Sequence, residues 1–340
     1  MNTQLLLIPL LFIVALQGCE RQDAPDNNEI NALTGDELQA FIKNVKDDLI
    51  FVEGGFFLMG DFGPEHSPER LPYDIEKHSK PLHKVELSSF SMSKHKTTNS
   101  EFQHYLKFND LPLRENGTVR KSEWDQMNSI AETPAHADWY ESAKYCDWLN
   151  EITGLPFSLP TEAQWEYAAR SRGQYYMVAT DDGTYRAEPY DLVTENYNPK
   201  GINISSRGNR IEFSSLQGWT LGSTSPLPVD MFPPNPLGIY SLTDNGLEWV
   251  KDWYAPDYYQ NSPMKDPQGP DRPVFKNKYG QYLKVMRGNA ETDPYWGGGV
   301  NILRHAVDPL GRFDGDEMPY LDYKTMRCVV NNPEPIITGR

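Results

Sequence analysis

The chain has 340 residues, 38% of them hydrophobic, and an excess of Asp and Glu that gives a formal net charge of −16. This composition is globular and is long enough for one large domain or two small ones. The acidic balance argues against nucleic acid and against an anionic membrane surface as the main partner, because both attract basic proteins. A basic partner is compatible with it.

An apolar run occupies residues 5–16 and is too short to span a bilayer comfortably, which is typical of the core of a signal peptide. The run ends in Leu16-Gln17-Gly18-Cys19, which resembles the lipobox of bacterial lipoproteins. The resemblance implies that residues 1–18 are removed and that Cys19 carries a lipid. Ordinary secretion with an incidental cysteine and an uncleaved anchor are the alternatives.

The lipoprotein resemblance also implies a location. A protein anchored through Cys19 is periplasmic, and Glu20 after the cysteine favours the outer membrane. Residues 19–33 are polar and acidic, so we expect them to form a lipidated tether without regular structure.

An amphipathic helix is predicted over residues 34–48. It opens with a Thr-x-x-Glu capping pattern at Thr34 and Glu37, and apolar residues follow at helical spacing: Leu38, Phe41, Ile42, Val45 and Leu49. The spacing gives the helix one apolar face, and we expect that face to pack on a domain that begins at about Leu49.

Short strands and capped helices alternate in the next part of the chain. Residues 49–61 predict two strands around a Gly-Gly turn, and residues 83–98 predict two more. Thr98 caps a helix, and residues 137–154 form a longer one that ends at Gly154. After Gly173 the periodicity fades over a long stretch, which is typical of a functional insert or irregular loop structure.

The segment FSLPTEAQWEYAARSRG (157–173) contains strong signals for the start of a helix. Thr161 and Gln164 form a capping box after a proline, and Glu166 and Arg170 have the spacing of an ion pair on one helix face. The residues alone predict a well-capped structural helix and no catalysis.

Taken in chain order, several segments resemble one family, the formylglycine-generating enzyme or sulfatase-modifying factor domain. They include FVEGGFFLMG (51–60), PLHKV (81–85), KTTNSEF (96–102), TP (133–134), WYESAKYCDWL (139–149), LPTEAQWEYAAR (159–170), PNPLGIY (234–240), EW (248–249), VMRG (285–288), Arg304 and MRC (326–328). The resemblance implies a single α+β domain of the C-type-lectin-like kind, low in regular secondary structure. That domain spans residues 49–332 and leaves 333–340 as a tail.

The resemblance does not extend to the oxidase chemistry. The family's oxidase holds copper with two cysteines, a soft ligand pair that selects Cu(I). They would follow Arg287-Gly288, but the stretch from there to Arg304 contains no cysteine. The family's Gly-Gly-Ser-Trp is also altered to Gly288-Asn289-Ala290-Glu291. We therefore expect no copper and assign no catalytic residue.

Two other cysteines match family positions that form a disulfide in some secreted members. They are Cys146, within residues 139–149, and Cys328. The resemblance implies a Cys146–Cys328 bridge, which suits an oxidising periplasm. Two separate buried thiols are the alternative.

A calcium loop is the second feature that the resemblance implies. The family binds calcium through an Asn, a Glu and the backbone between them, and here the loop is DNGLEW (244–249). Asn245, Gly246 and Glu248 are the implied ligands, since calcium prefers oxygen donors. A hydrogen-bonded turn without metal is the alternative.

Aromatic residues near the C-terminal third are candidates for a binding cleft. The candidates are Trp253, Tyr254, Tyr295 and Trp296, together with Arg304. Aromatic clusters are more often core packing, and that interpretation stays open.

These observations favour a lipid-anchored periplasmic binding or regulatory protein with a protein partner, for example in envelope assembly, sensing or neutralising a toxic effector. The alternative function is an enzyme of the same superfamily with non-copper oxidative chemistry, as in siderophore maturation. A purely structural, calcium-stabilised envelope component is the third possibility.

Overall fold

The computed structural model describes residues 27–76, 78–116, 120–190, 198–292, 300–312, 316 and 319–337. The signal segment and Cys19 lie outside them. The chain divides into two units, Met1–Ala40 and Phe41–Arg340. The expected amphipathic helix is present as α1 (Asn27–Asp47), but it begins inside the stretch expected to be a tether. None of the helices in the described ranges has the length and apolarity needed to cross a membrane.

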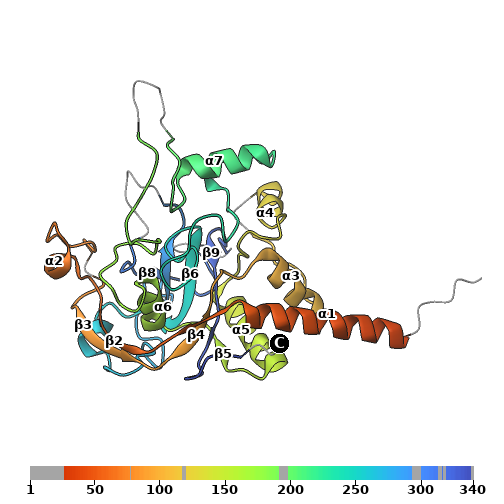
Figure 1. Ribbon diagram of the computed structural model, residues 1–340, viewed down its shortest axis with the longest axis horizontal. Coiled ribbons are helices and arrows are strands. Elements are labelled where there is room, and N and C mark those ends of the chain that lie inside the picture. Colours follow the sequence, from red (N-terminus) through yellow and green to blue (C-terminus); the bar gives the residue numbers. More distant parts are fainter. Residues whose placement is uncertain are drawn as a thin grey trace, which may run out of the picture. The chain divides into compact units, whose positions relative to one another are not determined.

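The first sheet joins the two ends of the large unit. Its order is β1 (Leu49–Val52), β4 (Phe90–Ser93), β10 (Val329–Val330) and β5 (Phe157–Ser158), and all neighbours are antiparallel. The late strand β10 lies between β4 and β5, with Val329 opposite both Met92 and Ser158. Residues near the C-terminal end are therefore part of the core of the sheet (Figure 1).

A second pair and a third sheet complete the strands. β2 (Gly55–Met59) pairs antiparallel with β3 (His83–Leu87). The third sheet has the order β8 (His305–Val307), β7 (Lys284–Asn289), β6 (Gly246–Trp253) and β9 (Lys324–Thr325), in which β9 is parallel to β6. This mixture of helices and short strands is the predicted α+β class.

Side-chain caps start most of the longer helices. The helices of the large unit after α1 are α2 (Gly63–His66), α3 (Asn99–Phe108), α4 (Lys121–Met127), α5 (Trp139–Thr153), α6 (Glu162–Ala169), α7 (Arg207–Leu216), the 3-10 turn η1 (Gly222–Thr224) and α8 (Tyr258–Asn261). Full capping boxes begin α3, α5, α6 and α7. The expected lack of regular structure after Gly173 is wrong at α7, where Ser206 and Asn209 supply the cap.

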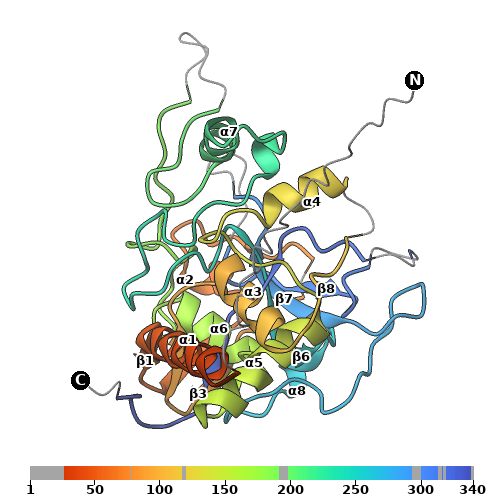
Figure 2. The ribbon, with the colours of Figure 1, turned by 90° about the vertical axis from the view of Figure 1, so that its right-hand side faces the viewer.

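Helix α6 is buried along its whole length, which explains its strict sequence. It contacts β2 and β3 as well as β6 and β7. In both views α6 lies inside the large unit (Figures 1 and 2). Its apolar residue Trp165 is fully buried, and so is the carboxylate of Glu166. A helix surrounded in this way has no solvent face, so every position along it is specified by packing or by a charge partner.

The charged residues of α6 are paired inside the core. Arg170 donates to Glu166, as the spacing predicts, at 2.8 Å. Arg287 on β7 bridges the helix by donating to both Glu162 and Glu166 at 2.8 Å. Arg304 adds two hydrogen bonds to Glu162, at 2.6 and 2.9 Å. Buried charges are tolerated only when they are paired in this way.

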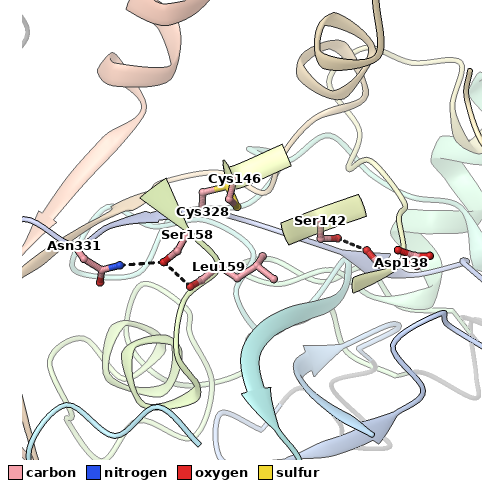
Figure 3. The surroundings of a disulfide bond; sticks show 7 residues. All are labelled: Asp138, Ser142, Cys146, Ser158, Leu159, Cys328 and Asn331. Atoms are coloured by element: carbon pink, nitrogen blue, oxygen red, sulfur yellow. Dashed lines mark hydrogen bonds between the residues drawn. A yellow bond between two sulfur atoms is a disulfide. The ribbon is translucent and has the colours of Figure 1, made fainter. Parts of the chain in front are cut away.

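The predicted disulfide is present. Cys146 on α5 and Cys328 just before β10 are bonded, with their Cα atoms 5.8 Å apart and both side chains buried (Figure 3). Beside the bridge, Asn331 donates to the Ser158 hydroxyl at 3.0 Å. The bridge therefore ties α5 to the central strand of the first sheet.

Candidate functional site

A pocket of about 330 Å³ opens at the third sheet, where residues from β6, β8 and β9 meet the chain on both sides of β7 and the chain that follows β8. Its lining residues are Leu247, Asn277, Gln281, Leu283, Ala290, Ala306, Val307, Asp308, Arg312, Tyr320, Asp322, Tyr323 and Lys324. A concave space of this size takes a small ligand or one or two side chains of a partner.

One wall of the pocket is aliphatic, because small and branched residues occupy the strand positions that face it. Leu247 on β6 lies opposite Lys324 on β9, and Ala306 and Val307 come from β8. Ala290 follows directly after β7. This wall offers surface that gains free energy when it is removed from water.

The other wall carries charges in balanced pairs. Arg312 donates to both carboxylate oxygens of Asp308, at 3.0 and 2.8 Å. Asp322 accepts a hydrogen bond from Asn116 at 2.6 Å, and the Lys324 ammonium lies 4.9 Å from the centre of the Tyr320 ring. The polar wall therefore has donors and acceptors but no large excess of one charge.

Burial shifts the proton equilibria of this wall. It raises the pKa of Asp322 to about 6, despite the nearby Lys324 ammonium, and lowers the pKa of Lys324 to about 8. It also raises the pKa of Tyr320 to about 12. A carboxyl and an amine that change charge close to neutral pH in one pocket are typical of a functional site.

This pocket adjoins the place where the resemblance puts the oxidase cysteines. Arg287 and Gly288 are in β7, and Ala290 is both the altered family position and a lining residue. Residues 293–299 lie outside the described residues, and their sequence contains no cysteine. Among the described residues, Ala290 is thus the one lining residue of the pocket that comes from this altered stretch.

The implied calcium ligands are occupied by protein groups. The Asn245 carboxamide exchanges two hydrogen bonds with the backbone of Leu227, at 2.8 and 3.0 Å. Lys96 donates to the Gly246 carbonyl at 3.0 Å and to Glu248 at 2.6 Å. An ammonium group stands where a metal ion would need these oxygens, so the donor set as folded does not fit calcium.

Glu248 has no spare lone pair directed at a metal. Arg327 donates to both of its oxygens, at 2.7 and 2.8 Å, and the indole of Trp165 donates at 2.9 Å. Within the described ranges, no group of three or more His, Cys, Asp or Glu side chains is arranged to hold a metal ion.

The proposed aromatic cleft is not assembled among the described residues. Tyr254 and Arg304 are buried, and Arg304 belongs to the ion-pair network of α6. Trp253 and Trp139 instead enclose the Lys284 ammonium, which lies 3.9 and 3.8 Å from their ring centres. Tyr295 and Trp296 lie outside the described residues.

The polar wall of the pocket was missed by reasoning from sequence. Arg312, Tyr320, Asp322 and Lys324 come from a segment without periodicity, and Asn116 comes from a distant loop. The one signal available was the dense YLDYK sequence at 320–324, which mixes aromatic, acidic and basic side chains within five residues.

Comparison with known proteins agrees with the fold. The profile of the "Sulfatase-modifying factor enzyme 1-like domain" matches residues 35–306. A formylglycine-generating enzyme of Streptomyces coelicolor is 27% identical over 260 residues, which cover 64% of this chain and 72% of the enzyme. The inactive C-alpha-formylglycine-generating enzyme 2 of Mus musculus is 25% identical, covering 61% and 70%.

Two further matches extend this comparison. Serine/threonine-protein kinase pkn1 of Chlamydia pneumoniae is 28% identical over 71% of this chain, which spans only 33% of the kinase's length. The solved structure of PvdO from Pseudomonas aeruginosa is similar with a TM-score of 0.55 and 23% identity, covering 83% of this chain and 93% of PvdO. The likeness to PvdO shows a shared fold.

Proposed function

Since the chain belongs to the family of sulfatase-modifying factor enzyme 1-like domains, we propose that it is a member without the copper oxidase chemistry and that it acts by binding a protein partner. The observations that support this are the pocket at the end of β7, with its aliphatic wall and its wall of paired polar groups, and the absence of cysteine from the sequence between Gly288 and Arg304. Roles in envelope assembly and in neutralising a toxic effector are both binding roles of this kind.

The chemistry of the pocket favours one anchoring side chain from the partner. The wall of Leu247, Ala306 and Val307 suits an apolar group, and the Asp308–Arg312 pair forms a polar rim. Binding energy at protein interfaces is concentrated in such buried anchors surrounded by polar rims. The net charge of −16 favours a partner with a basic surface, because complementary charge speeds association.

We also propose that the protein is periplasmic and is anchored in the outer membrane through a lipid on Cys19. The lipobox-like sequence supports this location. Metabolic labelling with a palmitate analogue should mark the unsubstituted protein (the parent), and Cys19→Ala should remove the label. Label that persists in the variant would contradict the anchor.

The binding role is tested by filling the pocket. Ala306 is exposed in the pocket wall, so Ala306→Trp should block the pocket without entering the core. Ala131→Trp is the control, because Ala131 is exposed and does not line the pocket. The full-length parent is used to capture partners from envelope extract of its own cells.

We expect one stoichiometric protein with the parent and the control, and its loss with Ala306→Trp. A parent that captures no stoichiometric protein would contradict the binding role. A partner that binds Ala306→Trp as tightly as the parent would show that the pocket is the wrong site.

A second candidate function is enzymatic, and the titrating groups of the pocket favour it. Asp322, with a pKa of about 6, and Lys324, with a pKa of about 8, suit proton transfer near neutral pH. Metal analysis of the purified protein and a screen for oxygen consumption distinguish the two functions. Stoichiometric iron or copper with oxygen uptake would support oxidative chemistry over simple binding.

A further inference from the structure

The loop that the family uses for calcium is held here by a lysine. Lys96 precedes α3, 150 residues from Gly246 along the chain, and its side chain is completely buried. Its ammonium group donates to the Gly246 carbonyl at 3.0 Å and to the Glu248 carboxylate at 2.6 Å. These are a backbone carbonyl and a carboxylate, the same two kinds of oxygen that calcium prefers.

The surrounding charges leave no electrostatic need for a metal ion. Three cations, Lys96, Arg210 and Arg327, face three carboxylates, Asp244, Glu248 and Glu291. These charges already balance, so an added divalent cation would bring two uncompensated positive charges next to the ammonium and guanidinium groups. In a buried site with low effective dielectric constant, that repulsion is strong.

The His136 side chain lies near the same charged groups and adds no charge to them. Its ring is buried, and neither ring nitrogen has a hydrogen-bond partner among the described residues. Burial, with the nearby Lys324 and Lys96 ammonium groups, lowers its pKa to about 3, so the ring is neutral. A neutral ring adds no charge that a metal ion would have to balance.

We propose that the Lys96 ammonium is a built-in cation that replaces bound calcium in the 244–249 loop and makes the folded protein independent of divalent cations. Removing it frees the Gly246 carbonyl and one lone pair of Glu248, with the Asp244 carboxylate in the same group of charges. The truncated variant therefore gains a divalent-cation site that the parent lacks.

The first test uses the full-length parent and no substitution. Its melting temperature is measured in EDTA and in 5 mM CaCl₂, and its metal content is measured after purification without chelator. We expect no bound calcium and the same melting temperature in both buffers. Stoichiometric calcium, or a melting temperature that falls in EDTA, would overturn the proposal.

The second test compares Lys96→Ala with Lys96→Met. Lys96→Ala opens space, so 5 mM CaCl₂ should raise its melting temperature by about 2–4 °C over EDTA. Lys96→Met fills the space without charge and should show no calcium response. Lys96→Ala that is equally stable in both buffers would show that the ammonium does not stand in for a metal ion.

Terbium gives a direct readout of the same site. The Trp165 indole donates to Glu248, so Tb³⁺ bound at this loop should be sensitised by tryptophan excitation. The signal is expected in Lys96→Ala, displaced by calcium, and absent in the parent and in Lys96→Met. Equal sensitised emission from the parent would contradict the replacement.

Discussion

Breaking the Cys146–Cys328 disulfide should reduce the free energy of unfolding by about 5 kcal/mol. The bond joins residues 182 apart in sequence, so it removes a very long open loop from the unfolded chain. The chain-entropy relation for a loop of that length gives about 5 kcal/mol at 25 °C. Divided by the unfolding entropy of a domain of roughly 300 residues, this corresponds to a fall in melting temperature of about 5–10 °C.

Both sulfur atoms are buried, so reduction requires opening of the structure. Cys146 is fully buried in α5, and Cys328 is only 1% exposed. We therefore expect the native protein to resist mild reductant for as long as it stays folded. Protein that has been unfolded in reductant and refolded should be less stable than the oxidised protein but keep its far-UV circular dichroism.

Denaturant unfolding of three samples measures the effect. The samples are the oxidised parent, the reduced parent and Cys146→Ala/Cys328→Ala, and the reduced parent separates loop entropy from the cavities left by alanine. A reduced parent that unfolds within about 1 kcal/mol of the oxidised protein would refute the entropic argument. Rapid reduction of the native protein would show that the bridge is accessible.

Three further substitutions test the core. Glu162→Gln removes the charge that pairs with two buried guanidinium groups, so it should lower the free energy of unfolding in denaturant by about 3–5 kcal/mol. A decrease below about 1 kcal/mol would show that the ion-pair network is not a major support. Burial raises the pKa of Asp252 to about 7, so the folded state holds a proton that the unfolded state releases above about pH 4. This group's contribution to stability is therefore lost as pH rises from about 4 to about 7, and Asp252→Asn should flatten that slope; an unchanged pH profile would contradict the assignment. Gly173→Ala places a Cβ 2.3 Å from Phe57 Cβ. It should lower the free energy of unfolding by about 1–3 kcal/mol more than Gly154→Ala, because Gly154 has a similar positive φ but open space around it. Equal losses in the two variants would contradict the clash.

The sequence predicted those features that depend on neighbouring residues. The caps at Thr98 and Thr161 and the Glu166–Arg170 pair join residues at most four positions apart, so the pattern contains all the partners. The sequence predicts the start of α1 too far along the chain, because the residues before Thr34 have no apolar periodicity that indicates a helix. The family resemblance supplied the disulfide pairing, which spacing alone does not determine.

The features that were missed depend on distant partners. Lys96 meets the 244–249 loop, and Arg304 meets Glu162, across separations that no local pattern encodes. The pocket is likewise assembled by bringing the strand residue Leu247 together with an aperiodic C-terminal segment. Arg304 is a cleft candidate by sequence, but its two hydrogen bonds to the Glu162 carboxylate place it in the core.

The course of β7 separates the pocket from the ion-pair network of α6. Arg287 points into the α6 ion-pair network, while Ala290 lines the pocket directly after the strand ends. Within three residues, the chain therefore passes from Arg287, whose side chain is paired with two buried carboxylates, to Ala290, whose side chain faces the pocket. A substitution of Ala290 therefore alters the pocket without removing a partner of Arg287, so the ion pairs of α6 keep their support.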